Sequence, residues 1–110
     1  NIVISSMCTV FAESEVVSRV AQNKDVADII HGLNVSVASK VGALAARLGK
    51  DHPGEYMMTG GVAKNRGIIQ ALEEKLGAKL YICDEAQLCG ALGAALFAYD
   101  KCKGSAEETR

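Results

Sequence analysis

Residues 58–65 read Met-Thr-Gly-Gly-Val-Ala-Lys-Asn, the end of an apolar strand followed by two glycines and the start of a helix. Glycines at such a turn let backbone N–H groups approach a ligand closely, and the start of the next helix favours a phosphate or the edge of a nucleotide. The stretch is neither the GxGxxG pattern of dinucleotide enzymes nor the GxxxxGK[ST] pattern of P-loop ATPases. By itself it is equally typical of any strand-to-helix turn in an α/β protein, so it indicates the fold first and a nucleotide site only together with other features.

Strand and helix patterns alternate on both sides of this turn. We expect strands at residues 1–5, 55–59 and 79–83, and helices at about 12–22, 25–48, 62–76 and 87–101. This order needs crossovers through helices and predicts an α/β fold with a mostly parallel sheet flanked by helices. Three strands make a thin sheet, and a parallel sheet needs cover on both faces. We therefore interpret the chain as a piece of a larger domain, or as a protein that completes itself by association.

The composition describes one domain's worth of chain. The 110 residues are 49% apolar and 23% charged, with a net charge of −1. This balance gives no sign of a nucleic-acid partner or a membrane partner, and charged residues interrupt the apolar stretches before the length of a membrane span. No signal-type segment opens the chain, and Asn1 reads as the interior of a strand rather than a native start. The cysteine spacing fits neither a zinc pair nor a disulfide framework, so we expect a cytoplasmic location.

Cys8 differs from Cys83, Cys89 and Cys102, which we interpret as small buried apolar residues. It lies in segment 5–11, which is too apolar for an ordinary surface loop and is expected to pack against something. The helix expected after it would stabilise a thiolate, the form of cysteine that binds iron. No histidine lies nearby in the sequence to form a Cys-His nucleophile. The predicted role of Cys8 is therefore that of a metal or cluster ligand.

Three segments together carry a family resemblance that none carries alone. They are Ser-Met-Cys-Thr-Val-Phe-Ala-Glu-Ser-Glu-Val at 6–16, Thr-Gly-Gly-Val-Ala-Lys-Asn at 59–65 and Gln-Leu-Cys-Gly-Ala-Leu-Gly-Ala-Ala at 87–95. In this order the chain closely resembles the ATP-dependent activators of 2-hydroxyacyl-CoA dehydratases, which form one family with the ATPase subunits of benzoyl-CoA reductase. The resemblance runs from about residue 4 to residue 98.

The resemblance implies part of an actin-, hexokinase- and Hsp70-like ATPase domain, with residues 1–102 as its C-terminal half and 103–110 as a polar tail. It implies ATP or ADP with Mg²⁺, and a homodimer that holds one 4Fe-4S cluster between its subunits, with Cys8 as a ligand. It also implies a dehydratase or reductase component as partner, and an electron donor such as ferredoxin or flavodoxin. The family's nucleotide-binding positions map onto Gly60, Gly61, Val62, Ala63, Asn65 and Gln87. Gln87 follows Ala86 here, where the family usually has a proline.

Two other functions stay open on the sequence. One is a cluster-free, kinase-like ATPase of the same superfamily, in which Gly60-Gly61 binds adenosine and Cys8 is only packed. The other is a non-catalytic assembly module that folds and associates but binds nothing. If the chain is instead part of a dehydratase activator, the 110 residues by themselves are expected to be inactive and prone to self-association.

Overall fold

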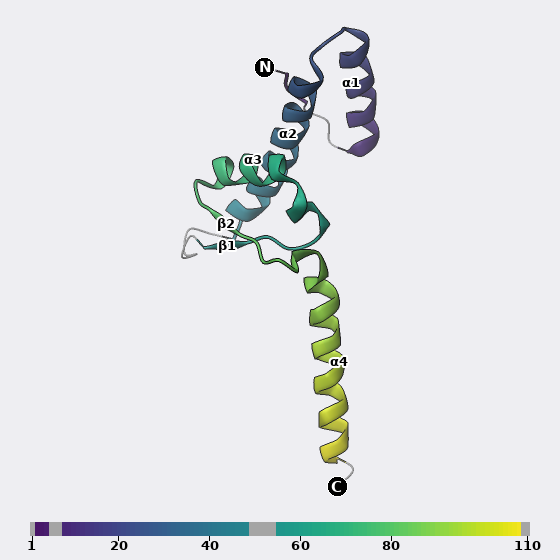
Figure 1. The fold of residues 1–110 in the computed structure, drawn as a ribbon, viewed down its shortest axis with the longest axis vertical. Helices are drawn as coiled ribbons and strands as arrows, with labels where there is room; N and C mark the ends of the chain where they lie inside the picture. The colour runs from purple at the N-terminus through teal and green to yellow at the C-terminus, as the bar shows by residue number, and fades with distance from the viewer. Residues whose placement is uncertain (1, 5–7, 49–54, 109–110) are drawn as a thin grey trace.

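The computed structural model describes residues 2–4, 8–48 and 55–108, and Figure 1 shows their path. The turn predicted at 49–54 and the first part of segment 5–11 lie outside the described residues. The elements in chain order are the helices α1 (Thr9–Ala21) and α2 (Val26–Ala46), strand β1 (Tyr56–Met57), the 3-10 helix η1 (Gly61–Lys64), helix α3 (Arg66–Leu76), strand β2 (Leu80–Tyr81), the 3-10 helix η2 (Ala86–Leu88) and helix α4 (Cys89–Glu108).

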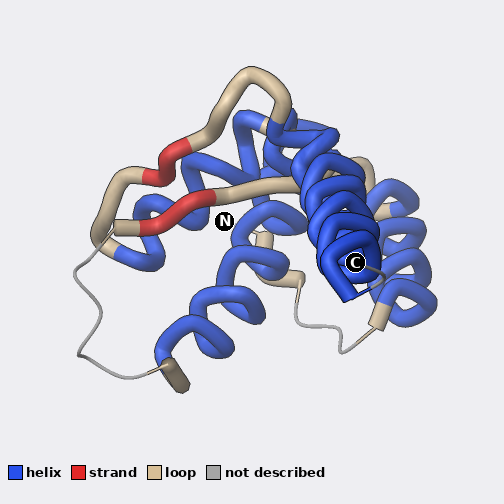
Figure 2. Tube along the Cα trace, turned by 90° about the horizontal axis from the view of Figure 1, so that it is seen from below, coloured by secondary structure: helices blue, strands red, loops and turns tan. Residues whose placement is uncertain are grey.

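The sheet confirms the predicted parallel arrangement with a helical crossover. β1 and β2 pair in parallel, with Tyr56 opposite Leu80 and Met57 opposite Tyr81, and α3 connects them. The N–H of Met58 donates to the carbonyl of Tyr81 over 3.0 Å, which extends the pairing beyond β1. Both strands therefore end at the same edge of the sheet, where their following loops meet (Figure 2).

The strand predicted at residues 1–5 was wrong for the part that the structure describes. Residues 2–4 belong to no strand, although Ile4 is only 3% exposed. A Cβ added to Gly32 of α2 would lie 2.7 Å from the carbonyl oxygen of Ile2, so this segment packs directly on the α2 backbone. This β-branched segment therefore packs on a helix and does not pair with a strand, although its residues favour strands.

Three helix boundaries also differ from the predictions. α1 begins at Thr9 rather than near residue 12, because Cys8 is its extended N-cap residue and its carbonyl accepts from the N–H of Ala12. α3 begins at Arg66 rather than at 62, because the residues after the glycine turn form η1 first. α4 continues to Glu108, past its predicted end at 101 and into the predicted polar tail.

The core is small and lies where α2 crosses α3. Ala38 of α2 packs with Ala71 and Leu72 of α3, and their exposed fractions are all below a tenth. The half-buried residues Met58, Ile68 and Leu80 pack against this cluster. Alanine side chains here let the two helices approach closely, and the sheet rests on the same cluster through Met58 and Leu80.

Much of the chain's apolar surface is uncovered. The accessible surface is 8649 Å², whereas a folded monomer of this mass is expected to expose about 5,800 Å². The radius of gyration is 19.3 Å, against about 13 Å for a domain of this length. Figure 1 shows the cause: α4 projects away from the other elements, and its main contact in the chain is η2. This agrees with the expectation of a layer that needs further cover.

Among the described residues, one helix, α2, is long and apolar enough to cross a membrane. No such segment was expected from the sequence. Length and composition alone are weak evidence, since the core helix of a non-membrane protein passes the same test. α2 packs against α3 and buries Ile29 and Ala38, whereas larger apolar side chains such as Ile30 and Leu44 are exposed in this chain.

Candidate functional site

The Gly60-Gly61 turn joins the sheet edge to η1 and depends on a backbone conformation that suits glycine. Gly60 has φ 93° and ψ 177°, and a Cβ added there would meet nothing within 4 Å. The glycine is therefore required by its dihedral angles and not by crowding. Gly61 does not have a positive φ, and a Cβ on it would lie 4.0 Å from Nε2 of Gln87, an ordinary contact.

The loop after β1 meets the loop after β2 at this turn. The N–H of Gly60 donates to the carbonyl of Ala86 over 2.7 Å, and Gln87 lies beside Gly61. Parallel sheets bind ligands at this edge, outside the carboxyl ends of the strands. The structure thus brings together three of the predicted nucleotide-binding residues, Gly60, Gly61 and Gln87, from separate parts of the sequence.

The remaining predicted residues of this region have different surroundings. Ala63 is 4% exposed and packs in the interior, whereas the side chain of Val62 is half exposed. Asn65 is the N-cap of α3, and its Oδ1 accepts from the backbone N–H groups of Gly67 and Ile68 at 3.0 and 3.2 Å. Its predicted place at the opening of the helix is confirmed, and its two hydrogen bonds cap the N-terminus of α3. Nucleotide contacts by all six residues stay a prediction.

Cys8 lies at the N-cap of α1 with an exposed thiol and no side-chain capping bond. The neighbouring Val10 and Phe11 are 69% and 62% exposed, so the described residues of this segment are not covered by the rest of this chain, and its predicted packing stays a prediction. In the described part of the chain, no group of three or more histidine, cysteine or acidic side chains is arranged to hold a metal. A metal-ligand role for Cys8 stays a prediction.

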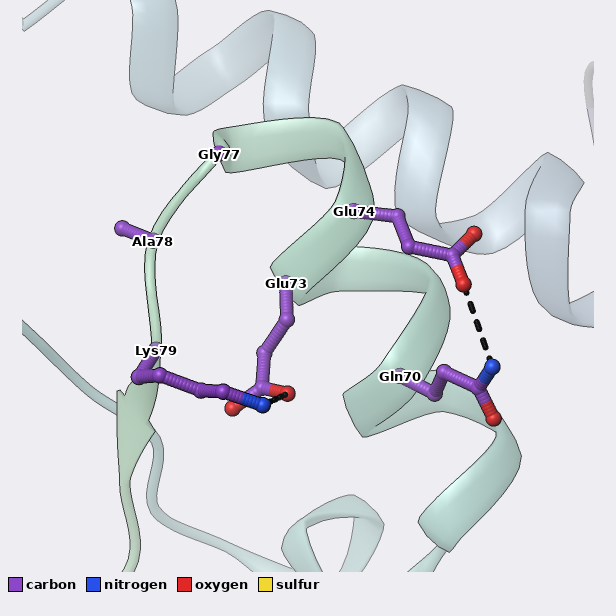
Figure 3. Close-up of a pocket in the computed structure, with 6 residues that line it drawn as sticks. All are labelled: Gln70, Glu73, Glu74, Gly77, Ala78 and Lys79. Carbon is purple, nitrogen blue, oxygen red and sulfur yellow. Dashed lines mark hydrogen bonds and ion pairs between the residues drawn. The ribbon is translucent and has the colours of Figure 1, made fainter.

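A shallow hollow that the sequence did not reveal lies where α3 ends and β2 begins (Figure 3). Glu73 accepts a hydrogen bond from the N–H of Leu80 at 2.9 Å and one from Nζ of Lys79 at 3.0 Å. The Leu80 bond, followed by the Lys79 bond, lowers the pKa of the Glu73 carboxyl. Gln70 donates to Glu74 one turn further along α3, and both residues line the same hollow. Glu73 thus links α3 to β2, and this arrangement is structural.

The amino-acid sequence was compared with protein families and with known proteins, and the matches agree with one another. The sequence pattern of the BadF/BadG/BcrA/BcrD ATPase family matches residues 1–98. The chain is 45% identical to the 2-hydroxyisocaproyl-CoA dehydratase activator of Clostridioides difficile over 107 residues, which are 97% of the chain and 40% of that protein. It is 54% identical to the (R)-2-hydroxyglutaryl-CoA dehydratase activating ATPase of Acidaminococcus fermentans over 103 residues, 92% of the chain and 38% of that protein.

Similarity extends to a reductase component and to solved structures. A benzoyl-CoA reductase subunit of Thauera aromatica is 31% identical over 100 residues, which cover 86% of the chain and 35% of that protein. The structure of the Clostridium difficile activator with bound ADPNP has a TM-score of 0.81 and 44% identity, and covers all of this chain. The chain spans about 40% of the length of the activators it matches.

Proposed function

The chain belongs to the BadF/BadG/BcrA/BcrD ATPase family, and from this premise we propose that it is the C-terminal part of an ATP-dependent activator of a 2-hydroxyacyl-CoA dehydratase or an aryl-CoA reductase. Activators of dehydratases, with an actin-like fold, are also its structural neighbours. The complete protein would use ATP to drive the transfer of one electron to its partner enzyme. The chain by itself, spanning about 40% of its relatives' length, is expected to be inactive.

The observation that carries the nucleotide part of this proposal is the contact between Gly60 and the Ala86–Gln87 loop, which is the first part of η2. It places an exposed glycine turn and an amide side chain at the sheet edge where α/β proteins bind nucleotides. Without a Cβ at Gly60 or Gly61, a ligand can lie directly on the backbone. ATP or ADP with Mg²⁺ is the proposed ligand, in keeping with the ADPNP bound to one of the similar structures.

Cys8 is the proposed ligand of a 4Fe-4S cluster shared between two copies of the protein. Its thiol is exposed at the N-terminus of α1. Such a cluster takes four cysteine thiolates and, when bound, accepts and passes on one electron. Two copies of this chain supply two Cys8 thiolates, and the other two ligands are proposed to come from residues outside it. The exposed Val10 and Phe11 beside Cys8 offer apolar surface for a subunit interface.

The fold suggests how nucleotide binding could act at a distance. The Ala86–Gln87 loop runs directly into α4, which begins at Cys89 and has little other support in the chain. A shift of this loop on nucleotide binding would therefore reorient α4 as a lever. The apolar residues Leu92, Leu96 and Phe97 on α4 are more than half exposed and would carry the movement to a neighbouring surface.

Dehydratase or reductase components, with ferredoxin or flavodoxin as electron donor, are the proposed partners.

Reconstitution with iron and sulfide separates this proposal from a cluster-free ATPase. The complete protein that contains this chain would be treated anaerobically, beside its Cys8→Ser variant and a Cys102→Ser control. Cys102 is also an exposed free cysteine but lies on α4. We expect thiolate-to-iron absorption in the wild type and the control and its loss in Cys8→Ser. Equal absorption in all three would overturn the cluster assignment and favour the cluster-free ATPase.

A titration of the same complete protein with ATP and ADP tests the nucleotide assignment separately. Saturable binding that weakens when Gln87 is replaced by alanine supports it, since Gln87 lies beside the glycine turn. Absence of binding by the wild type would leave the non-catalytic assembly module as the better account. The Gln87→Ala variant loses an exposed side chain, so it is expected to fold as the wild type does.

A further inference from the structure

Cys83 and Cys89 form a close pair of thiols that the proposed function does not use. Their Sγ atoms lie 3.6 Å apart, and both residues are half-buried, whereas Cys8 and Cys102 are exposed. Cys83 follows β2, and Cys89 is the first residue of α4. The Sγ of Cys89 also lies 3.6 Å from the carbonyl oxygen of Glu85, to which it can donate. The fold thus brings these two sulfur atoms into contact across the loop that joins β2 to α4.

We propose that Cys83 and Cys89 are a dithiol site that is reversibly oxidised to an intrachain disulfide by exchange with a low-molecular-weight disulfide. A disulfide bond requires about 2.05 Å between the sulfur atoms. The sulfur atoms must therefore approach by roughly 1.5 Å, a movement that side-chain rotation in a loop and a first helical turn can provide. Cys8 and Cys102, on α1's N-cap and on α4, have no sulfur partner among the described residues.

The exchange balances without any further reactant. The thiolate of one cysteine attacks a disulfide RSSR, forms a mixed disulfide and releases one RS⁻, which takes up a proton to give RSH. The second protein thiol loses its proton, attacks the protein sulfur of the mixed disulfide and releases the second RSH. Two protein thiols are oxidised, and one RSSR is reduced to two RSH. The contact with Cys83, and then burial, raises the pKa of the Cys89 thiol. We therefore expect the exchange to become faster as the pH rises.

The position of the pair gives the disulfide a consequence for the candidate site. Cys83 and Cys89 bracket the loop that carries Ala86 and Gln87, and Ala86 accepts the hydrogen bond from Gly60. A disulfide would close this loop into a small ring and restrict its movement. If the loop binds nucleotide, which rests on the proposed function, any effect of oxidation on nucleotide affinity is matched by an equal effect of nucleotide on the disulfide equilibrium.

Peptide mapping by mass spectrometry tests the site. The complete protein, without cluster and under anaerobic conditions, would be incubated with a defined ratio of oxidised to reduced glutathione and then trapped with acid. We expect a cross-linked Cys83–Cys89 peptide in the wild type and in the Cys102→Ser control. In Cys83→Ser and Cys89→Ser the remaining thiol should instead form a mixed disulfide with glutathione. A wild type that gives only mixed disulfides, or cross-links of Cys83 with Cys8 or Cys102, would overturn the proposal.

Repeating the incubation in denaturing urea separates the folded contact from the short spacing along the chain. Sulfur atoms held in contact react at a higher effective concentration than atoms joined by a flexible loop. The equilibrium constant for the Cys83–Cys89 disulfide should therefore be at least about tenfold higher in the folded protein than in urea. Equal constants would show that the structure contributes nothing and would contradict the assignment. This comparison needs no substitution, so it does not depend on the folding of a variant.

Adding ATP or ADP to the folded samples tests the coupling to the candidate site. A shift of the disulfide equilibrium by either nucleotide supports a link through the Ala86–Gln87 loop. If the protein binds no nucleotide while the disulfide forms as expected, the proposed function fails and the dithiol site stands. If nucleotide binds and no cross-link forms, the dithiol site fails and the proposed function stands.

Discussion

Replacing Gly60 with alanine tests the geometry of the candidate site most closely. At φ 93° and ψ 177°, Gly60 occupies a region that is almost exclusive to glycine, and holding another residue there costs about 1–3 kcal/mol. A methyl group at this position meets nothing within 4 Å, so no clash adds to the strain. If the turn relaxes instead, it gives up the 2.7 Å hydrogen bond to Ala86, with a net cost of about 1 kcal/mol. Either route lowers the free energy of unfolding by about 1–3 kcal/mol.

Gly61→Ala is the matched control at the next position. Gly61 has no positive φ, and its added methyl group would touch only Nε2 of Gln87 at 4.0 Å, so its stability should stay within about 0.5 kcal/mol of wild type. If nucleotide lies on this backbone, however, the methyl group should weaken ATP binding by about tenfold, or about 1.4 kcal/mol. Urea unfolding and ATP titration of the complete protein measure both quantities. A Gly60→Ala variant with wild-type stability and wild-type affinity would refute the reasoning.

Substitutions at three further positions probe what supports the site. Asn65→Ala should lower stability by about 1 kcal/mol through loss of the α3 cap, while Asn65→Asp keeps it, and equal melting of the two would be inconsistent with capping. Leu72→Ala, at 3% exposure in the core, should cost about 2–5 kcal/mol in urea unfolding, and a loss below about 1 kcal/mol would disagree with the packing described. The pKa of the Glu73 carboxyl is lower in the folded chain than in the unfolded chain. Its contribution to the free energy of unfolding is therefore fully present above the unfolded pKa, and it is lost as the pH falls through the folded pKa. Wild type should therefore exceed Glu73→Gln in stability at neutral pH and not in strong acid, and a gap unchanged by pH would count against the Lys79 and Leu80 contacts.

Local signals in the sequence were sufficient for the features that depend on neighbouring residues. Cys8 precedes the first helix and α3 ends at Leu76, both as predicted, and Asn65 and Gly77, the latter with φ 66°, cap α3. Caps and left-handed glycines are set by a few adjacent residues, so the sequence alone identifies them. The alternation of strands and helices likewise predicted the parallel pairing of β1 with β2, because a helical crossover of this length leads to a parallel partner.

The failed predictions concern choices that depend on tertiary packing or on weak local preferences. The β-branched residues at 2–4 pack on α2 at Gly32, which no propensity reveals. Residues 103–110 were predicted to be a polar tail beyond the last helix, yet alanine and glutamate favour helix and let α4 continue to Glu108. Lys103 lies over the ring of Tyr99 at 4.9 Å, a contact at i,i+4 spacing that supports this extension.

The contacts that define the candidate site could not be predicted from the sequence. The hydrogen bond from Gly60 to Ala86 and the thiol pair of Cys83 with Cys89 both depend on how the two loops meet. Each of these cysteines, like Cys102, was predicted to be a small buried apolar residue, but Cys83 and Cys89 are only half-buried and Cys102 is exposed. Spacing alone does not show that the sulfur atoms of Cys83 and Cys89 meet. Family resemblance pointed to Gly60 and Gln87, and the structure adds that they lie at one edge of the sheet.

This chain is proposed as part of an ATP-dependent activator in which Cys8 binds the cluster. The most direct measurement is the activation of a 2-hydroxyacyl-CoA dehydratase by the complete, reconstituted protein with a low-potential reductant, with and without ATP. We predict turnover only when ATP is present, and loss of that turnover in Cys8→Ser while ATP binding is retained. Activation without ATP, or activation by Cys8→Ser equal to that of the wild type, would contradict the account.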